Sequence, residues 1–111
     1  MVAHGRIRSM ALEQIQRDAD EWIQKHTPGY FQPLMMLARL TEELGELSRA
    51  VSHHHGEKRP KPGEEKGDIA DEIGDLLFVL ACLANSLGIS MDDAWTGLKK
   101  KLYERDKDRW T

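Results

Sequence analysis

"LTEELGELSRAV", residues 40–51, carries leucine side chains at helical spacing and three glutamates within two turns. A second stretch, "DIADEIGDLLFVL" at residues 68–80, places four carboxylates at the start of an apolar run. Apolar residues that recur every three or four positions predict an amphipathic α-helix in each stretch. The acidic residues of these two helices are then either solvated faces or the two halves of one metal site.

A helical wheel places the carboxylates of each helix relative to its apolar stripe. Successive residues turn by about 100° around the axis, so Glu43 and Glu46 lie on one flank of the first stripe, whereas Glu42 points away from it. On the second helix, Glu72 and Asp75 form a similar pair at the margin of the apolar face. We expect the stripe of the first helix to be buried; it consists of Leu37, Leu40, Leu44, Leu47 and Val51.

Antiparallel packing of the two helices would bring these acidic margins together. Four carboxylates in one place repel one another, and burying them is costly unless a cation compensates. Ligation by oxygen alone suits Mg²⁺ or Mn²⁺, and Mg²⁺ usually binds the phosphates of a substrate, which predicts phosphoryl or nucleotidyl chemistry. The alternative, solvated faces with aspartates as helix caps, is the commoner use of these residues. Against it, Glu42 and Glu46 form an unfavourable like-charged pair four residues apart.

Four helices account for the chain after its first residues. Residues 10–26 carry a one-sided apolar stripe, and Pro33 suits the start of a second helix that ends between residues 51 and 54. The glycine, proline and charged residues of 56–67 predict a loop. No strand pattern or internal repeat is present, so the predicted fold class is all-α, a four-helix bundle.

The ends of the last two helices show residues that commonly cap helices. Asp68 suits the N-cap of the third helix, with Asp71 three residues later, and Gly88 suits its C-terminal stop. Ser90 repeats the N-capping arrangement and opens a fourth helix that continues through Leu102. The third helix is apolar nearly all round, which indicates a central helix or an interface between identical subunits. We therefore expect a homodimer or homotetramer.

Composition and length exclude several classes of protein. A chain of 111 residues with 40% hydrophobic and 32% charged residues is typical of one globular domain, placed at residues 10–111, while residues 1–9 look like a disordered leader. The net charge of −3 argues against a nucleic-acid partner. The longest apolar run is too short to cross a membrane, so no membrane partner is expected. A single cysteine, Cys82, allows no internal disulfide and fits a cytoplasmic location.

Three histidines at residues 53–55 end the second helix. They do not supply the Glu-x-x-His pairs that a di-iron carboxylate bundle requires. Because they follow one another directly, they cannot all face one way. We interpret them as a solvated helix terminus, favoured by the helix dipole when protonated, where any transition-metal binding would be adventitious.

The two acidic motifs together resemble those of the MazG-like nucleoside triphosphate pyrophosphohydrolases, members of the all-α NTP pyrophosphatase superfamily. The pattern Glu-Glu-x-x-Glu, a spacer and Glu-x-x-Asp stands here as "EELGE" at residues 42–46 and "EIGD" at residues 72–75. Either motif alone is a weak signal, but both in this order in a small all-α chain are a strong one. The resemblance covers nearly the whole chain after the leader.

The resemblance implies that Glu43, Glu46, Glu72 and Asp75 bind Mg²⁺, for which Mn²⁺ can substitute. It also implies hydrolysis of nucleoside triphosphates between the α and β phosphates, and many such enzymes remove unwanted nucleotides in a housecleaning role. One carboxylate accepts a proton from the attacking water, and the candidates are Glu42, Glu43 and Glu46. Two other classes stay open: a non-catalytic nucleotide- and metal-binding sensor or partner-binding module, and a structural oligomerisation domain.

The same resemblance implies substrate contacts outside the acidic motifs. Lys101 and Arg105 occupy the places of a Lys-Phe-x-x-x-Arg pattern near the chain end, although Lys99 stands where asparagine is usual. An ordinary basic helix end is the other interpretation. Relatives place an aromatic residue of the first helix near the base, and aromatic side chains stack well on bases, although they are more often core. The candidates for contact with the base are Trp22, Phe31 and Asn85.

Overall fold

The computed structural model describes residues 11–26, 29–56 and 59–107, so the predicted leader at residues 1–9 lies outside the described part of the chain. Within these ranges there are helices, turns and loops and no strand, which confirms the all-α fold class. The helices are α1 (Ala11–His26), α2 (Pro33–His55), α3 (Ile69–Ser86) and α4 (Met91–Lys107).

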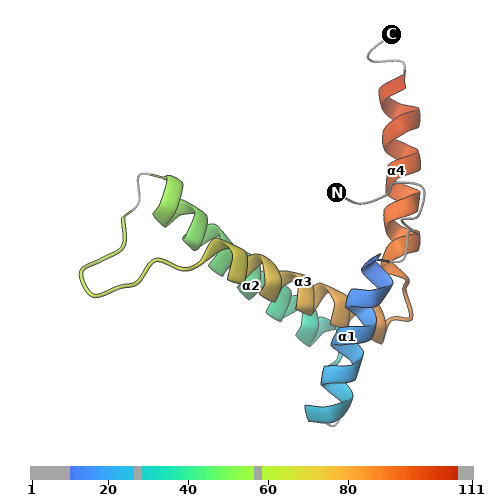
Figure 1. Cartoon of the computed structure of the whole chain (residues 1–111), viewed down its shortest axis with the longest axis horizontal. Coiled ribbons are helices and arrows are strands. Elements are labelled where there is room, and N and C mark those ends of the chain that lie inside the picture. Colours follow the sequence, from blue (N-terminus) through green and yellow to red (C-terminus); the bar gives the residue numbers. More distant parts are fainter. Residues whose placement is uncertain (1–10, 27–28, 57–58, 108–111) are drawn as a thin grey trace.

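Helix α3 lies at the centre of the arrangement. It packs side by side with α2 in the opposite direction, and the long loop after α2 joins the two helices at one end (Figure 1). Helix α1 crosses α3 near its other end, and α4 packs against α1 and runs away from α2. These contacts bury Val79, Ala81 and Cys82 of α3, whereas Ile73 and Leu80 stay 52% and 40% exposed.

The helix ends follow the capping chemistry that the sequence predicts. The Asp68 side chain accepts a hydrogen bond from the backbone N–H of Asp71 at 3.0 Å, and Pro33 opens α2. Gly88 has a φ of +67°, the left-handed conformation that favours glycine after a helix. Ser90 Oγ accepts from the backbone N–H of Asp93 at 3.2 Å. These caps fix the start of α3 and the sharp turn into α4.

The turn between α3 and α4 also bears on membrane crossing. No single helix of the described residues is both long and apolar enough to cross a membrane. Helix α3 and the residues Met91–Arg105 reach that length and composition only as a pair, and they are bent by 102° where they meet.

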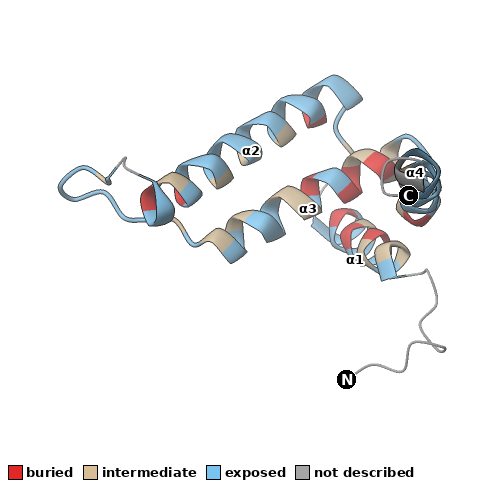
Figure 2. Ribbon diagram, turned by 90° about the horizontal axis from the view of Figure 1, so that it is seen from above, coloured by how far each residue is buried: buried red, intermediate tan, exposed pale blue. Residues whose placement is uncertain are grey.

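The core lies where α1, α2 and α3 meet. Figure 2 marks buried positions on each of these three helices, and the core cluster draws its residues from all three. On α2, the buried Met36 and Ala50 belong to the side that packs against α3. The residues of this core cluster are Ala19, Ile23, Met36, Ala81 and Cys82.

The leucine stripe of α2 does not form part of this core. Leu37 is 50% exposed, Leu44 is 55% exposed and Val51 is 42% exposed. The prediction that the stripe is buried is therefore wrong for these three residues in the single chain, whereas Leu40 and Leu47 are half-buried. The physical reason is that α3 is the main partner of α2 in this chain and covers the side that carries Met36 and Ala50.

Candidate functional site

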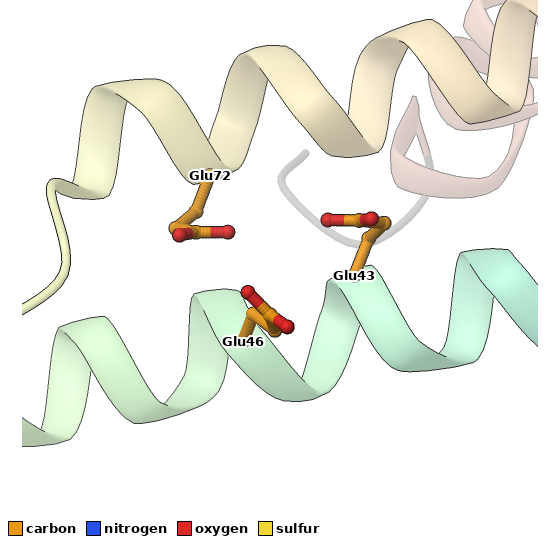
Figure 3. Close-up of side chains that lie close together, drawn as sticks. All are labelled: Glu43, Glu46 and Glu72. Carbon is orange, nitrogen blue, oxygen red and sulfur yellow. The ribbon is translucent and has the colours of Figure 1, made fainter.

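Three glutamates converge between α2 and α3. Glu43 and Glu46 extend from α2 and Glu72 extends from α3, so that all three side chains point into the space between the helices (Figure 3). One carboxylate oxygen from each residue lies within 4.8 Å of the other two. Antiparallel packing thus brings together three of the four metal ligands that the sequence predicts. We call these three residues the acidic cluster.

The helix periodicity of α2 places Glu43 inside the contact with α3, whereas Glu46 is exposed. Glu43 lies seven residues after Met36 and seven before Ala50, so the three side chains share one face of the helix. The Glu43 side chain is only 17% exposed. It lies deeper in the helix–helix contact than the predicted position at the margin of a leucine stripe.

Two small residues let the chain approach α2 closely beside the cluster. A side chain at Gly67 would place its Cβ 3.2 Å from Ala50 Cβ and 3.7 Å from Glu72 Oε1. The first is tighter than most carbon contacts in proteins, so glycine suits this position. The close approach brings the start of α3, with Glu72, over the acidic residues of α2.

The electrostatics of the cluster favour a cation. Burial raises the pKa of the Glu72 carboxyl, and the charges of Glu46, Asp75 and Glu43 raise it further. Glu72 Oε2 is enclosed and has no hydrogen-bond partner among the described residues. An enclosed carboxylate oxygen that faces like charges is costly unless a cation compensates. An all-oxygen donor set of this kind fits Mg²⁺ or Mn²⁺.

Asp75 and Glu42 lie outside the three-oxygen group. Asp75 is exposed, one turn after Glu72 on α3, although its charge reaches Glu72 and helps to raise the pKa of that carboxyl. Glu42 is exposed on α2, as its outward position on the helical wheel predicts. Neither residue contributes an atom to the group of close carboxylate oxygens.

An arginine that sequence reasoning missed lies beside the cluster. Arg39 Nη2 is 3.7 Å from Glu43 Oε1, one turn earlier on α2. Its spacing of four residues from Glu43 is the signal that could have identified it, because oppositely charged residues at this spacing are neighbours on a helix. Arg39 thus places a positive charge next to a group of negative ones.

Arg39 also lines a largely apolar cavity of about 270 Å³. Trp22, Phe31 and Phe78 line it, together with Arg39. The rings of Trp22 and Phe78 meet edge to face, with centroids 5.8 Å apart. The structure therefore places the predicted base-stacking residues Trp22 and Phe31 around one cavity. We call it the aromatic cavity.

Asn85 belongs to a hydrogen-bond network that joins α1 to α3. Its Nδ2 donates to the Gln16 backbone carbonyl at 2.9 Å and to Tyr30 Oη at 3.0 Å, while its Oδ1 accepts from Gln16 Nε2. The Tyr30 hydroxyl in turn donates to Asp20. Burial, with Asp20 adding to it, raises the pKa of Tyr30 to about 12. The Asn85 amide is thus engaged within the chain and does not line the aromatic cavity.

The two basic residues predicted to bind phosphate lie far along α4. Lys101 and Arg105 are exposed on this helix, which packs against α1 and runs away from α2 (Figure 1). The structure does not bring Lys101 and Arg105 to the acidic cluster of their own chain.

His53 corrects the prediction that the three histidines form a solvated helix end. His53 is only 1% exposed, and its Nε2 lies 3.8 Å from Glu64 Oε1 in the loop after α2, whereas His54 and His55 are exposed. His53 follows Ala50 by three residues, so it shares the buried side of α2. Its Nδ1 has no hydrogen-bond partner within the described part of the chain.

Comparisons with known proteins agree with this fold and these motifs. YpjD of Bacillus subtilis (strain 168) is 53% identical over 100 residues, which cover 90% of this chain and 90% of YpjD. A crystal structure of YpjD matches with a TM-score of 0.73 and 48% identity, covering 86% of this chain and 97% of that one.

A second crystal structure is that of the Bacillus-conserved MazG protein, a nucleotide pyrophosphohydrolase. It matches with a TM-score of 0.74 and 42% identity, covering 93% of this chain and 98% of that one. Residues 31–110 also match the family model of the MazG nucleotide pyrophosphohydrolase domain. The chain therefore belongs to the MazG nucleotide pyrophosphohydrolase family.

Proposed function

We propose that the chain is a Mg²⁺-dependent hydrolase that converts nucleoside or deoxynucleoside triphosphates into the monophosphate and pyrophosphate. The observation that carries this proposal is the acidic cluster, in which Glu72 lies beside Glu43 and Glu46 and its Oε2 is enclosed with no hydrogen-bond partner among the described residues. Membership of the MazG family supports hydrolysis of a nucleotide.

The acidic residues would have two roles in the reaction, metal binding and acceptance of a proton. Glu43, Glu46 and Glu72 would hold Mg²⁺ together with Asp75, and the bound ion would supply positive charge to phosphate oxygens and lower the pKa of a water. One of Glu42, Glu43 and Glu46 would accept the proton of the attacking water. In the reaction a bond forms between the water oxygen and the α-phosphorus, and the bond to the bridging oxygen breaks so that pyrophosphate leaves.

The aromatic cavity would receive the base of the nucleotide. Trp22 and Phe31 offer ring faces on which a base can stack. Arg39 both lines this cavity and lies 3.7 Å from Glu43, so a nucleotide with its base in the cavity would have its phosphates near the cluster. Asn85 has less support as a base contact, because its amide is already engaged by Gln16 and Tyr30.

We further propose that the working form is a homo-oligomer. The radius of gyration is 17.6 Å, whereas a compact domain of this length has about 13 Å. The leucine stripe of α2 is uncovered, and covering it would remove apolar area from water. Because α4 leads away from the cluster of its own chain, Lys101 and Arg105 would reach the phosphates of a nucleotide only at the cluster of another copy.

The test is pyrophosphate release from a panel of canonical and modified nucleoside triphosphates, measured with Mg²⁺ and with a chelator. We expect pyrophosphate and the matching monophosphate in equal amounts, only with Mg²⁺. Orthophosphate as the direct product would mean cleavage at the terminal phosphate and would refute the assigned bond. Mg²⁺-dependent binding of nucleotide with no product would show a sensor rather than an enzyme, and a preference for damaged bases would support a housecleaning role in the cytoplasm.

A further inference from the structure

We propose that Arg39 is a nucleotide-binding residue that exchanges partners, pairing with Glu43 in the metal-free chain and with the phosphate nearest the sugar when metal and nucleotide are bound. The inference rests on the proposed function, since it requires a nucleotide whose base lies in the aromatic cavity. It assigns a binding role to a residue outside both acidic motifs and outside the basic end of α4.

The first argument is position. Arg39 lines the aromatic cavity, and its Nη2 lies 3.7 Å from Glu43 Oε1 in the acidic cluster. The cavity is otherwise lined by side chains such as Trp22 and Phe31, and among the described residues around it Arg39 is the only one that is charged at neutral pH. Arg39 is thus a neighbour of both the cavity and the acidic cluster, so a ligand that occupies both would lie beside its side chain.

The second argument is the chemistry of the side chain. A guanidinium is planar, always charged, and presents several N–H donors in a fork that matches two phosphate oxygens. In a nucleotide the base and the first phosphate are joined through one sugar. With the base in the cavity, the group that follows it toward Glu43 is therefore an anion, and Arg39 provides the charge that neutralises it.

The third argument is that the present pair of Arg39 is easily broken. Its separation of 3.7 Å is longer than a charge-assisted hydrogen bond, which is about 2.7–2.9 Å. The Arg39 side chain is 49% exposed, so water screens the attraction to Glu43. A cation in the acidic cluster would compete for the Glu43 oxygen, and the guanidinium would then be available to phosphate.

The experiment compares the wild-type chain with Arg39→Gln and with the control Arg49→Gln. Arg49 is exposed on the same helix, ten residues later, and does not line the aromatic cavity, so both variants lose one positive charge from α2. The probes are the four deoxynucleosides and their 5′-monophosphates, measured by titration calorimetry in Mg²⁺. Mn²⁺ alone, measured by electron paramagnetic resonance, reports the affinity of the metal site.

For the preferred base, we expect Arg39→Gln to weaken binding of the monophosphate at least about tenfold, a loss of about 1.4 kcal/mol. Binding of the nucleoside should stay within about twofold, and Mn²⁺ affinity should be unchanged or higher because the competing guanidinium is gone. Arg49→Gln should match the wild type throughout. Thermal unfolding of both variants would confirm that each is folded.

Four results would overturn the inference. Equal loss of monophosphate and nucleoside affinity would mean that Arg39 only shapes the cavity, and a parallel loss of Mn²⁺ affinity would mean that it acts through Glu43. A wild-type chain that binds no monophosphate more tightly than its nucleoside would also exclude the phosphate contact. Pyrophosphate release by the wild type is measured separately. If the wild type releases pyrophosphate and Arg39→Gln binds the monophosphate as tightly as the wild type does, the role of Arg39 is refuted and the proposed hydrolysis stands.

Discussion

The carboxylate of Asp92 on α4 accepts a hydrogen bond from the backbone N–H of Glu13 at 3.0 Å, so the first turn of α1 is capped by a residue 79 positions away. The N–H of Leu12 makes a second, longer bond to the same carboxylate. The side chain of Asp92 is buried between the two helices. The N-terminus of a helix carries a partial positive charge, so the Asp92 carboxylate is favourable there. Its hydrogen bonds to α1 also hold α4 against α1.

Replacing this cap should destabilise the protein. Asp92→Ala removes an acceptor from two N–H groups of α1, and we expect it to lower the free energy of unfolding by about 1–2 kcal/mol. Urea denaturation measures the change. The neighbouring Asp93 has an exposed side chain, so Asp93→Ala should cost clearly less. Equal losses in the two variants would contradict the capping role of Asp92.

Removing one charge from the acidic cluster should separate activity from stability. Glu46→Gln replaces a charged carboxylate of the proposed metal site with a neutral amide, and we expect hydrolysis to fall by about 100-fold or more. The chelated variant should be as stable as the wild type or more stable, because repulsion within the cluster is relieved. Asp75→Asn should likewise remove activity. Glu65→Gln, in the exposed loop, is the control and should retain turnover. Full activity of both Glu46→Gln and Asp75→Asn would place the site elsewhere.

The pH dependence of stability should report Glu72. Burial and neighbouring carboxylates raise its pKa above the ordinary 4.5, so the folded state holds this proton more tightly than the unfolded chain does. The contribution of Glu72 to stability is therefore present at low pH and is lost as the pH rises through its folded-state pKa. In chelator, Glu72→Gln should raise Tm at pH 7 relative to the wild type, and the difference should vanish near about pH 4.

The same pair of proteins tests the metal site when Mg²⁺ replaces the chelator. A ligand that binds only the folded state raises Tm, and Glu72→Gln lacks one carboxylate of the proposed metal site. We expect Mg²⁺ to stabilise the wild type more than the variant. An equal shift in both proteins would show that Glu72 does not bind the ion.

His53 should be more important for stability than the exposed His55. Its ring is buried on the side of α2 that carries Ala50, and His53→Ala would leave a cavity, so we expect a loss of about 1–3 kcal/mol. His55→Ala, two residues later and exposed, should change little. Thermal or urea unfolding of the two variants measures the difference, and similar small effects would contradict a structural role for His53.

The uncovered leucine stripe should mediate self-association. Leu44 is exposed in the single chain, so Leu44→Lys replaces no buried residue. The substitution places a charge in the middle of the stripe and should shift the oligomer toward monomer. Sedimentation velocity at micromolar concentration measures the change, with Glu65→Lys as a control in the loop. A wild-type chain that sediments as a monomer at that concentration would remove the basis for the expected homo-oligomer.

Features set by a few neighbouring residues were predictable from the sequence. Pro33, Asp68 and Gly88 marked helix ends because their chemistry acts on the backbone next to them. The wheel also placed Glu43 and Glu72 on sides of their helices that could meet. The spacing of residues along one helix was enough for these conclusions.

Features that depend on which element covers which face were not predictable in this way. A wheel orders the residues of α2 relative to one another, but it does not tell that Met36 rather than Leu44 turns toward α3. The burial of His53 depends on a loop that folds back over it, and the cap of α1 by Asp92 joins opposite ends of the chain. Each of these is decided by tertiary contacts.

An ion bound at the acidic cluster would hold α2 and α3 together in addition to the loop that joins them. The oxygens of the cluster come from two helices, so an ion bound there would cross-link them independently of the loop that joins them. Lengthening a flexible loop is inexpensive, about 0.6 kcal/mol for each doubling. The turn at Gly63, with φ +84°, lies in the exposed part of this loop and away from the ligand-bearing turns. With the ion as tether, the hairpin should tolerate inserted residues at this turn and keep its helices in register.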